Sequence, residues 1–292
     1  MNYSDDAAFK NRLRKRRKKR PHSTASILFI TIILSLVCVA VVYGIIYISG
    51  LRYMKIELEN GDVVKFFGRV GADGSPYSGK LYFSDGATAS VDMESNTVEY
   101  QNNDVYKGEL KNLLRNGEGV MYFASGDVYQ GNFLNDKITG FGHFIYSNGD
   151  EYEGEFLDGN RQGTGAYTWK DGACYLGTYA DDMKNGAGKY VWADGSYYDG
   201  TFSDDMKHGK GAYVFENGDT YTGDFYNDKR TGKGTYKWAN GEQYEGEFAD
   251  NNMNGWGVYS WPSGRVVEGY FEDNKFIRTE PSEPSGSADS SN

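Results

Sequence analysis

Few residues of this chain have the types and spacing that catalysis or metal binding requires. The three histidines, His22, His143 and His208, lie in unrelated places. Of the two cysteines, Cys38 falls in an apolar segment and Cys174 stands alone, which excludes a disulfide framework. No Ser-His-Asp set, zinc spacing or carboxylate pair can be assembled. We expect His143 and His208 to be exposed, because they occupy variable positions of the repeats described below. The sequence therefore predicts a non-enzymatic protein with no cofactor or metal site.

Two recurring patterns resemble binding motifs without meeting their requirements. Glycine pairs such as Gly163/Gly165 occur seven times, but a phosphate loop needs a strand-to-helix turn, and these pairs lie within predicted strands. Neighbouring carboxylates at 181–182 and 204–205 could bind calcium weakly, but they lack the ligand pattern of a calcium loop. Solubilising turn residues are the favoured interpretation of these carboxylates.

The dominant pattern is a tyrosine followed two residues later by a glycine, repeated every 23 residues. The seven pairs are Tyr106/Gly108, Tyr129/Gly131, Tyr152/Gly154, Tyr175/Gly177, Tyr198/Gly200, Tyr221/Gly223 and Tyr244/Gly246, and Val267/Gly269 begins a truncated eighth copy. A fixed period of this length indicates a repeat architecture.

Each copy is predicted to be a two-strand hairpin. In the third copy the first strand spans residues 152–156 and the second spans 163–169, each with alternating residue types. Alternation with period two indicates strands, and the Asp-Gly or Asn-Gly that follows most copies indicates a tight turn. No helical period occurs after residue 50.

Alternation also assigns the two faces of each hairpin. One face of the third copy is predicted to carry rings and glycines, and the other face to be polar. The aromatic face would hold Tyr152, Gly154, Phe156, Gly163, Gly165, Tyr167 and Trp169. We expect rings to lie over the glycines, which offsets the usual weakness of glycine in strands. Stacked copies would form a twisted antiparallel sheet of the all-β class.

The unit Y-x-G-x-F-x(6)-G-x-G-x-Y-x-W/F-x-x-G resembles the MORN repeat (membrane occupation and recognition nexus), and the resemblance covers residues 106–271. It implies an elongated, twisted, single-layer antiparallel sheet of tandem β-hairpins with an aromatic groove. Such arrays generally act as protein-interaction scaffolds, and phospholipid binding has been proposed for some. Enzymes of the family carry a separate catalytic domain, and no stretch of this chain is long enough to be one.

The N-terminal part predicts a transmembrane helix. Residues 25–48 form a run of 24 without a charge, and a helix of that length reaches about 36 Å, enough for a hydrocarbon core of about 30 Å. The basic segment 10–20 precedes it, so residues 1–24 are predicted to be a cytoplasmic tail and the repeats to be extracytoplasmic on a single-pass cell-membrane protein. The length of the apolar run disfavours a cleaved signal peptide. The basic segment 10–20 directly precedes the helix, which disfavours a nuclear localisation signal.

The remaining segments are predicted from their composition. Residues 49–105 are less regular, but 79–86 copy the second half of a repeat, so we expect degenerate hairpins that cap the array. The array is predicted to span residues 106–277. Residues 278–292 are rich in Pro and Ser and are expected to be disordered.

Charge narrows the choice of partner. Nine of the 31 Lys and Arg lie in residues 10–20 and two of the 41 acidic residues precede position 20. This leaves 22 basic and 39 acidic residues, a formal charge of −17, in the rest of the chain. We expect such a body to repel nucleic acid and anionic lipid at long range.

The aromatic face is the predicted functional surface, because exposed apolar strips usually mark interaction sites. An extended peptide or an amphipathic helix of a protein partner would lie along it. A lipid head group or a glycan is the alternative occupant, and rings that only fill the core of the sheet are the explanation without binding. The predicted anchors are Tyr167, Trp169, Tyr190, Trp192, Tyr213, Phe215, Tyr236 and Trp238.

Overall fold

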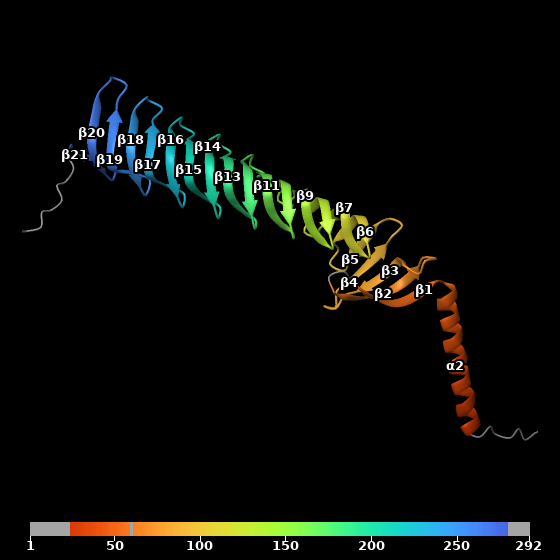
Figure 1. Cartoon of the computed structure of the whole chain (residues 1–292). Coiled ribbons are helices and arrows are strands. Elements are labelled where there is room, and N and C mark those ends of the chain that lie inside the picture. Colours follow the sequence, from red (N-terminus) through yellow and green to blue (C-terminus); the bar gives the residue numbers. More distant parts are fainter. Residues whose placement is uncertain (1–23, 59–60, 280–292) are drawn as a thin grey trace, which may run out of the picture.

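The computed structural model describes residues 24–58 and 61–279, which form one helix and one long open sheet (Figure 1). The predicted basic tail, apart from residue 24, and nearly all of the predicted disordered tail lie outside the described residues. The helix is α2 (Thr24–Ile48). The strands are β1 (Leu51–Glu57), β2 (Val63–Val70), β3 (Pro76–Tyr82), β4 (Thr88–Asp92), β5 (Thr97–Tyr100), β6 (Val105–Lys111), β7 (Leu114–Tyr122), β8 (Val128–Leu134), β9 (Lys137–Ile145), β10 (Glu151–Leu157), β11 (Asn160–Thr168), β12 (Cys174–Ala180), β13 (Met183–Val191), β14 (Tyr197–Ser203), β15 (Met206–Val214), β16 (Thr220–Tyr226), β17 (Lys229–Lys237), β18 (Gln243–Ala249), β19 (Asn252–Ser260), β20 (Val266–Glu272) and β21 (Lys275–Arg278).

Each strand pairs antiparallel with the next, so the sheet is a continuous meander from β1 to β21. The register places residues of the same type opposite each other on neighbouring strands. Tyr175 of β12 lies opposite Tyr190 of β13, and Gly177 lies opposite Gly188. The predicted class is confirmed: an elongated single-layer antiparallel sheet of hairpins, preceded by an apolar helix long enough to span a membrane (Figure 1).

Each full hairpin places a buried tyrosine over two facing glycines. In the third copy Gly154 and Gly165 face each other across β10 and β11. A Cβ added at Gly165 would overlap the Tyr152 ring, so only glycine leaves room for it. The seven tyrosines of this kind have no exposed surface and are Tyr106, Tyr129, Tyr152, Tyr175, Tyr198, Tyr221 and Tyr244. The expectation that rings lie over glycines is confirmed.

The buried tyrosines also explain why this position is not phenylalanine. The Tyr198 hydroxyl donates a hydrogen bond of 3.0 Å to the carbonyl oxygen of Thr201, and the other six donate to the carbonyl three residues later in the same way. The hydroxyl is therefore satisfied inside the core. Burial raises the pKa of Tyr198 to about 12. Its ring packs edge-to-face on Phe202 and Phe225, with centroids 5.1 and 5.0 Å away.

The expectation that Gly163 shares the aromatic face is wrong. Gly154 faces Gly165, but Phe156 faces Arg161, so β11 carries a bulge between these pairs. Gly163 lies in the bulge with a φ of 64°. A side chain there would meet the Glu155 carboxylate, which belongs to the polar face. A bulge breaks the two-residue alternation, so faces cannot be counted through it.

The N-terminal end contains a degenerate hairpin and the helix. Phe66 of β2 has no exposed surface, and its ring lies against Gly68 and Gly79, which pair across β2 and β3. Phenylalanine thus takes the place of the buried tyrosine. In α2 the leucines, isoleucines and valines from Leu28 onward are exposed, apart from the partly exposed Ile46, and none of the membrane-span candidate 28–48 is buried by the described part of the chain.

Candidate functional site

The eight predicted anchors lie next to one another in a single row. Successive ring centroids are 4.5 Å apart for Tyr167–Trp169, 4.9 Å for Trp169–Tyr190, 4.5 Å for Tyr190–Trp192, 5.0 Å for Trp192–Tyr213, 4.3 Å for Tyr213–Phe215, 5.7 Å for Phe215–Tyr236 and 4.7 Å for Tyr236–Trp238. The row continues through Phe123, Phe144 and Tyr146 at one end and Tyr259 and Trp261 at the other. We call these thirteen residues the aromatic ladder.

The ladder is half-buried, unlike the buried tyrosines beside it. Each of the eight anchors packs against the core and leaves part of its ring exposed. Trp169 lies one residue beyond β11, because its amide donates to the carbonyl of Ala173 and closes the turn. The second strand therefore ends one residue earlier than predicted, and it begins three residues earlier, at Asn160. The aromatic face is divided into a core row and an accessible row, a division that alternation alone did not predict.

A basic residue packs against a tyrosine ring in five copies, and in four of them that tyrosine belongs to the ladder. The distance from its charged group to the ring of a tyrosine is 5.7 Å for Arg115 and Tyr100, 5.4 Å for Arg161 and Tyr167, 5.2 Å for Lys184 and Tyr190, 5.4 Å for Lys207 and Tyr213 and 5.0 Å for Arg230 and Tyr236. The ring faces attract the cations. Burial lowers the pKa of Lys184, whose side chain is 18% exposed.

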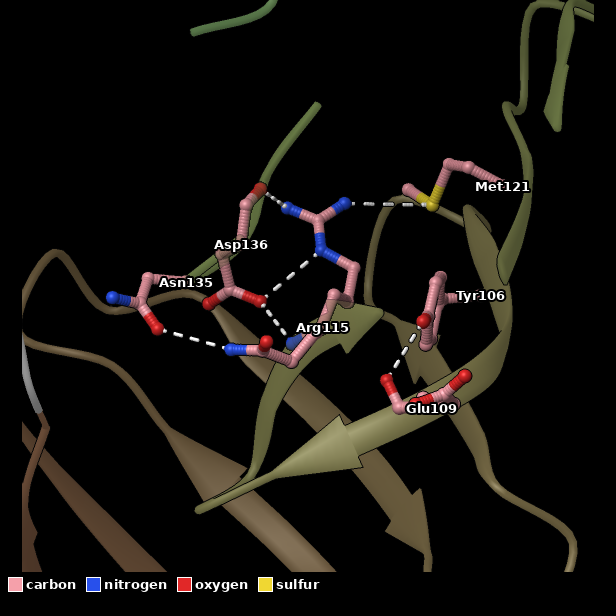
Figure 2. Close-up of polar contacts among 7 residues, drawn as sticks. Tyr106, Glu109, Arg115, Met121, Asn135 and Asp136 are labelled. Carbon is pink, nitrogen blue, oxygen red and sulfur yellow. Dashed lines mark hydrogen bonds and ion pairs between the residues drawn. The ribbon is translucent and has the colours of Figure 1, made fainter. Parts of the chain in front are cut away.

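The same basic residues join neighbouring repeats. Figure 2 shows Arg115, whose backbone amide and Nε donate to the Asp136 carboxylate at 2.8 and 3.1 Å. Arg161 and Asp182 repeat this arrangement at 2.9 and 3.1 Å. We call this arrangement the turn staple. Its sequence signal, which we missed, is a basic residue followed by an acidic or amide residue 21 positions later.

The turn staple corrects the interpretation of the paired carboxylates. Asp181 and Asp182 are the two residues of a tight turn, with φ of 47° and 67°. Asp182 accepts hydrogen bonds from the preceding repeat, so its role is structural and not only solubilising. Within the residues that the structure describes, no group of three or more His, Cys, Asp and Glu is placed to hold a metal ion.

A second row of carboxylates joins the repeats at the opposite edge. Asp150 accepts a hydrogen bond from the amide of Lys170 and another from the hydroxyl of Tyr167, both 2.9 Å long. These bonds hold the pKa of Asp150 below its ordinary value, the bond from the Lys170 amide most strongly. Asp104, Asp127 and Asp219 likewise accept the amide 20 residues later. In two central repeats the position is Ala173 and Ser196.

The prediction of exposure holds only in part for the two histidines of the array: the His143 side chain is 39% exposed, and His208 is half-buried. The ring of His143 shares a hydrogen bond of 3.1 Å with the Glu151 carboxylate. The ring of His208 lies 5.2 Å from that of Tyr226. Cross-strand neighbours cover both side chains, and a single sequence does not identify such neighbours before the register is known.

The polar face carries a groove that the sequence analysis missed. The groove has a volume of about 730 Å³ and a floor of facing glycines from β15 to β19. Its rim includes Lys210, Lys233, Glu245 and Trp256. The sequence signal for this groove is Trp256, which occupies the variable position between Gly255 and Gly257. The Trp256 Nε1 donates to the Glu268 carboxylate at 3.3 Å.

These features define an open-sheet protein of tandem hairpins with an accessible aromatic ladder. The chain belongs to the MORN repeat family, which matches residues 106–128, 129–151, 152–174, 175–197, 198–220, 221–243 and 244–264. The matched residues are more than half of the 292-residue chain.

The other comparisons find only distant likeness. No curated protein matches the chain. Among solved structures, the TCP10 domain of Danio rerio CPAP in complex with a STIL peptide is 13% identical with a TM-score of 0.38, over 75% of this chain and 100% of that one. The TCP domain of Drosophila melanogaster SAS-4, in complex with a proline-rich motif of Ana2, is 14% identical with a TM-score of 0.28, over 70% of this chain and 98% of that one. Likeness at this level does not transfer a function.

Proposed function

We propose that the chain is a membrane-anchored scaffold that binds an extended segment of a protein partner along the aromatic ladder. The observation that carries this proposal is the continuity of the ladder from Phe123 to Trp261, with neighbouring centroids 4.3–5.8 Å apart and one side of the row accessible. Aromatic anchors dominate the energetics of most protein interfaces. The eight predicted anchors form the central part of this surface.

Unused hydrogen-bond donors on the ladder support a peptide as the occupant. Within the described part of the chain, the indole N–H groups of Trp169, Trp192 and Trp238 have no protein acceptor. Tryptophan at interfaces commonly combines an apolar ring contact with a hydrogen bond from its N–H. A peptide backbone supplies carbonyl acceptors at regular intervals, which neither an acyl chain nor a bare apolar surface provides.

The test compares a ladder variant with a variant of the opposite face. Full-length protein in detergent micelles, immobilised, would recover partners from a membrane extract. Trp192→Ala with Trp238→Ala should reduce recovery at least tenfold, about 1.4 kcal/mol, because two anchors are lost. Trp256→Ala, on the polar face, should leave recovery unchanged. Circular dichroism and thermal melting check that all variants are folded. Equal recovery by the folded ladder variant would contradict the proposal.

The anchor is part of the proposal. The exposed apolar side chains of α2 need a covering, which a bilayer would supply. We place residues 1–24 in the cytoplasm, the cap of 49–105 nearest the membrane and the array of 106–277 beyond it, followed by the tail of 278–292. Reporters that work on one side of the membrane only, fused to each terminus, test this topology. Signals from the same side for both termini would contradict a single span.

A further inference from the structure

The two central repeats differ from the others at the edge next to the ladder. Asp150, at the end of the second repeat, accepts from the Tyr167 hydroxyl and the Lys170 amide of the third. Asp219, at the end of the fifth repeat, accepts from the Tyr236 hydroxyl and the Ala239 amide of the sixth at 2.7 and 2.8 Å. The third and fourth repeats carry Ala173 and Ser196 at this position, which have no carboxylate to accept these bonds.

The missing carboxylates release donors beside the ladder. Within the described residues, the Tyr190 hydroxyl and the Ala193 amide have no protein acceptor, although the equivalent groups of the third and sixth repeats have one. The Glu216 amide is also without an acceptor. Ala193 and Glu216 are exposed, so these amides are open to a ligand. The Tyr190 hydroxyl, on a half-buried ring, and the two exposed amides can therefore donate to a ligand that supplies acceptors.

The same two repeats expose a negative charge that the flanking repeats lack. Two residues before the position of Asp150 and Asp219, the flanking repeats carry the neutral residues Asn148 and Asn217, whereas the central repeats carry Asp171 and Asp194. Asp171 and Asp194 are exposed. Burial of the Tyr190 ring, together with the negative charge of Asp171, raises the pKa of that phenol. In the two central repeats the carboxylate therefore lies in the turn that follows Trp169 or Trp192, and not at the position that bridges repeats.

The spacing of these groups fits one backbone conformation. One repeat contributes two strands, so equivalent groups of neighbouring repeats are about 9.6 Å apart. A polyproline II helix has three residues per turn and rises about 9.3 Å per turn, and every third side chain points the same way. A β-strand alternates sides at each residue, so side chains three residues apart point to opposite sides.

We propose that the central rungs of the ladder bind a polyproline II segment that carries Lys or Arg at every third residue. This inference rests on the proposed function. Proline rings pack on Trp169 and Trp192, as in other aromatic grooves that recognise this helix. Peptide carbonyl oxygens accept hydrogen bonds from the Tyr190 hydroxyl and the Ala193 amide. The cationic side chains reach Asp171 and Asp194, and the formal charge of −17 beyond residue 20 accelerates the encounter.

The experiment uses two peptides, (Arg-Pro-Pro)₅ and (Gln-Pro-Pro)₅, and full-length protein in detergent micelles. Asp171→Asn with Asp194→Asn copies the residue of the flanking repeats. It should weaken binding of the arginine peptide about tenfold and leave the weaker glutamine peptide unaffected. The matched control, Glu153→Gln with Glu245→Gln, removes two exposed carboxylates from the polar face and should change neither affinity more than twofold. Equal losses in the two double variants would overturn the inference, because binding would then follow net charge alone.

A second variant separates hydrogen bonding from charge. Ala173→Asp with Ser196→Asp restores the carboxylate of the flanking repeats, so the Tyr190 hydroxyl and Ala193 amide acquire an internal acceptor. It adds negative charge, and simple attraction would tighten binding of the arginine peptide. We expect weaker binding of both peptides instead, and tighter binding would overturn the inference.

A third variant, Trp169→Ala with Trp192→Ala, tests the proposed function. If it also left peptide binding unchanged, the proposed function itself would fail. If peptide binding were lost in the tryptophan variant but unchanged in the carboxylate variants, the proposed function would stand and the inference would be rejected.

Discussion

At the scale of single residues, tyrosine and glycine act as one unit. The Tyr198 ring occupies the space above Gly200 and Gly211, and its hydroxyl reaches the Thr201 carbonyl. The tyrosine ring fits only where the facing residues have no side chain, and without the ring the space above the glycines would be empty. A buried cavity or an overlap would follow from either change. The strict pairing of these residue types in the sequence follows from this contact.

Gly211→Ala tests this unit. The new Cβ would overlap the Tyr198 ring and hydroxyl, and we expect the free energy of unfolding to fall by about 1–3 kcal/mol. Ala212→Ser, one residue along on the polar face, should change it by less than about 0.5 kcal/mol. Urea denaturation followed by circular dichroism measures both. Equal stability of the two variants would show that the glycine is not required by the ring.

At the scale of strands and hairpins, each junction between repeats is joined at two edges. Arg161 and Asp182 illustrate the turn staple at one edge. Asp150, with Lys170 and Tyr167, illustrates the carboxylate that bridges repeats at the other edge. One hairpin is marginal alone in water, so bonds that cross junctions convert single hairpins into a continuous sheet.

The bridging carboxylates should control acid stability. Hydrogen bonds from the Ser147 and Lys170 amides hold the pKa values of Asp127 and Asp150 below the ordinary value. A pKa that is lower in the folded state stabilises the fold above the unfolded-state pKa, and this stabilisation is lost as pH falls through the folded-state pKa. The variant with Asp127→Ala and Asp150→Ala should be less stable at pH 7 and should lose less stability between pH 5 and pH 2. Parallel stability curves for variant and wild type, measured by urea denaturation across pH, would contradict this assignment.

The junction between Ile138 and Gly159 lacks the turn staple and can be given one. Ile138 and Gly159 occupy the positions of the basic residue and its acidic partner, and only the backbone hydrogen bond of 2.9 Å between them remains. A Cβ at Gly159 would meet open space, but its φ of 96°, against 67° for Asp182, means that Gly159→Asp alone costs backbone strain. Ile138→Arg and Gly159→Asp should therefore couple favourably, by about 0.5–1 kcal/mol. A double-mutant cycle measures the coupling between the two changes, and a coupling of zero would show that the staple contributes no stability.

The sequence predicted the hairpins well and the junctions poorly. Residue alternation in 152–156 and 163–169 depends on neighbours within one copy, so it identifies strands directly. The bond between Arg161 and Asp182 joins residues whose proximity depends on register, and the bulge at Gly163 reverses a face locally. The eight ladder residues were predicted together because they share two repeat positions, two residues apart. Their division from the buried tyrosines depends on ring orientation, which sequence spacing does not specify.

At the scale of the whole molecule, the array has no single core that must close. The twenty consecutive strand pairs all have the same antiparallel form, and each strand pairs through its backbone only with its neighbours in the chain. Stability in such a protein is approximately a sum of repeat and nearest-neighbour contributions. Whole repeats can therefore be added or removed without disturbing the ladder, whereas a change by any other number of residues would shift the rings out of the row.

Deletion of residues 198–220 tests this property. The deletion removes one full copy of 23 residues, so Tyr221 follows Tyr197 at the same phase and the ladder joins Trp192 to Tyr236. The shortened protein should remain folded, with a slightly lower melting temperature, because one repeat and one junction are lost. Deletion of 198–219, one residue fewer, should instead place the rings of the following strand on the polar face. Far-ultraviolet circular dichroism and thermal melting compare the two. Equal stability would mean that the hairpins fold independently and that the shared aromatic face does not stabilise the sheet.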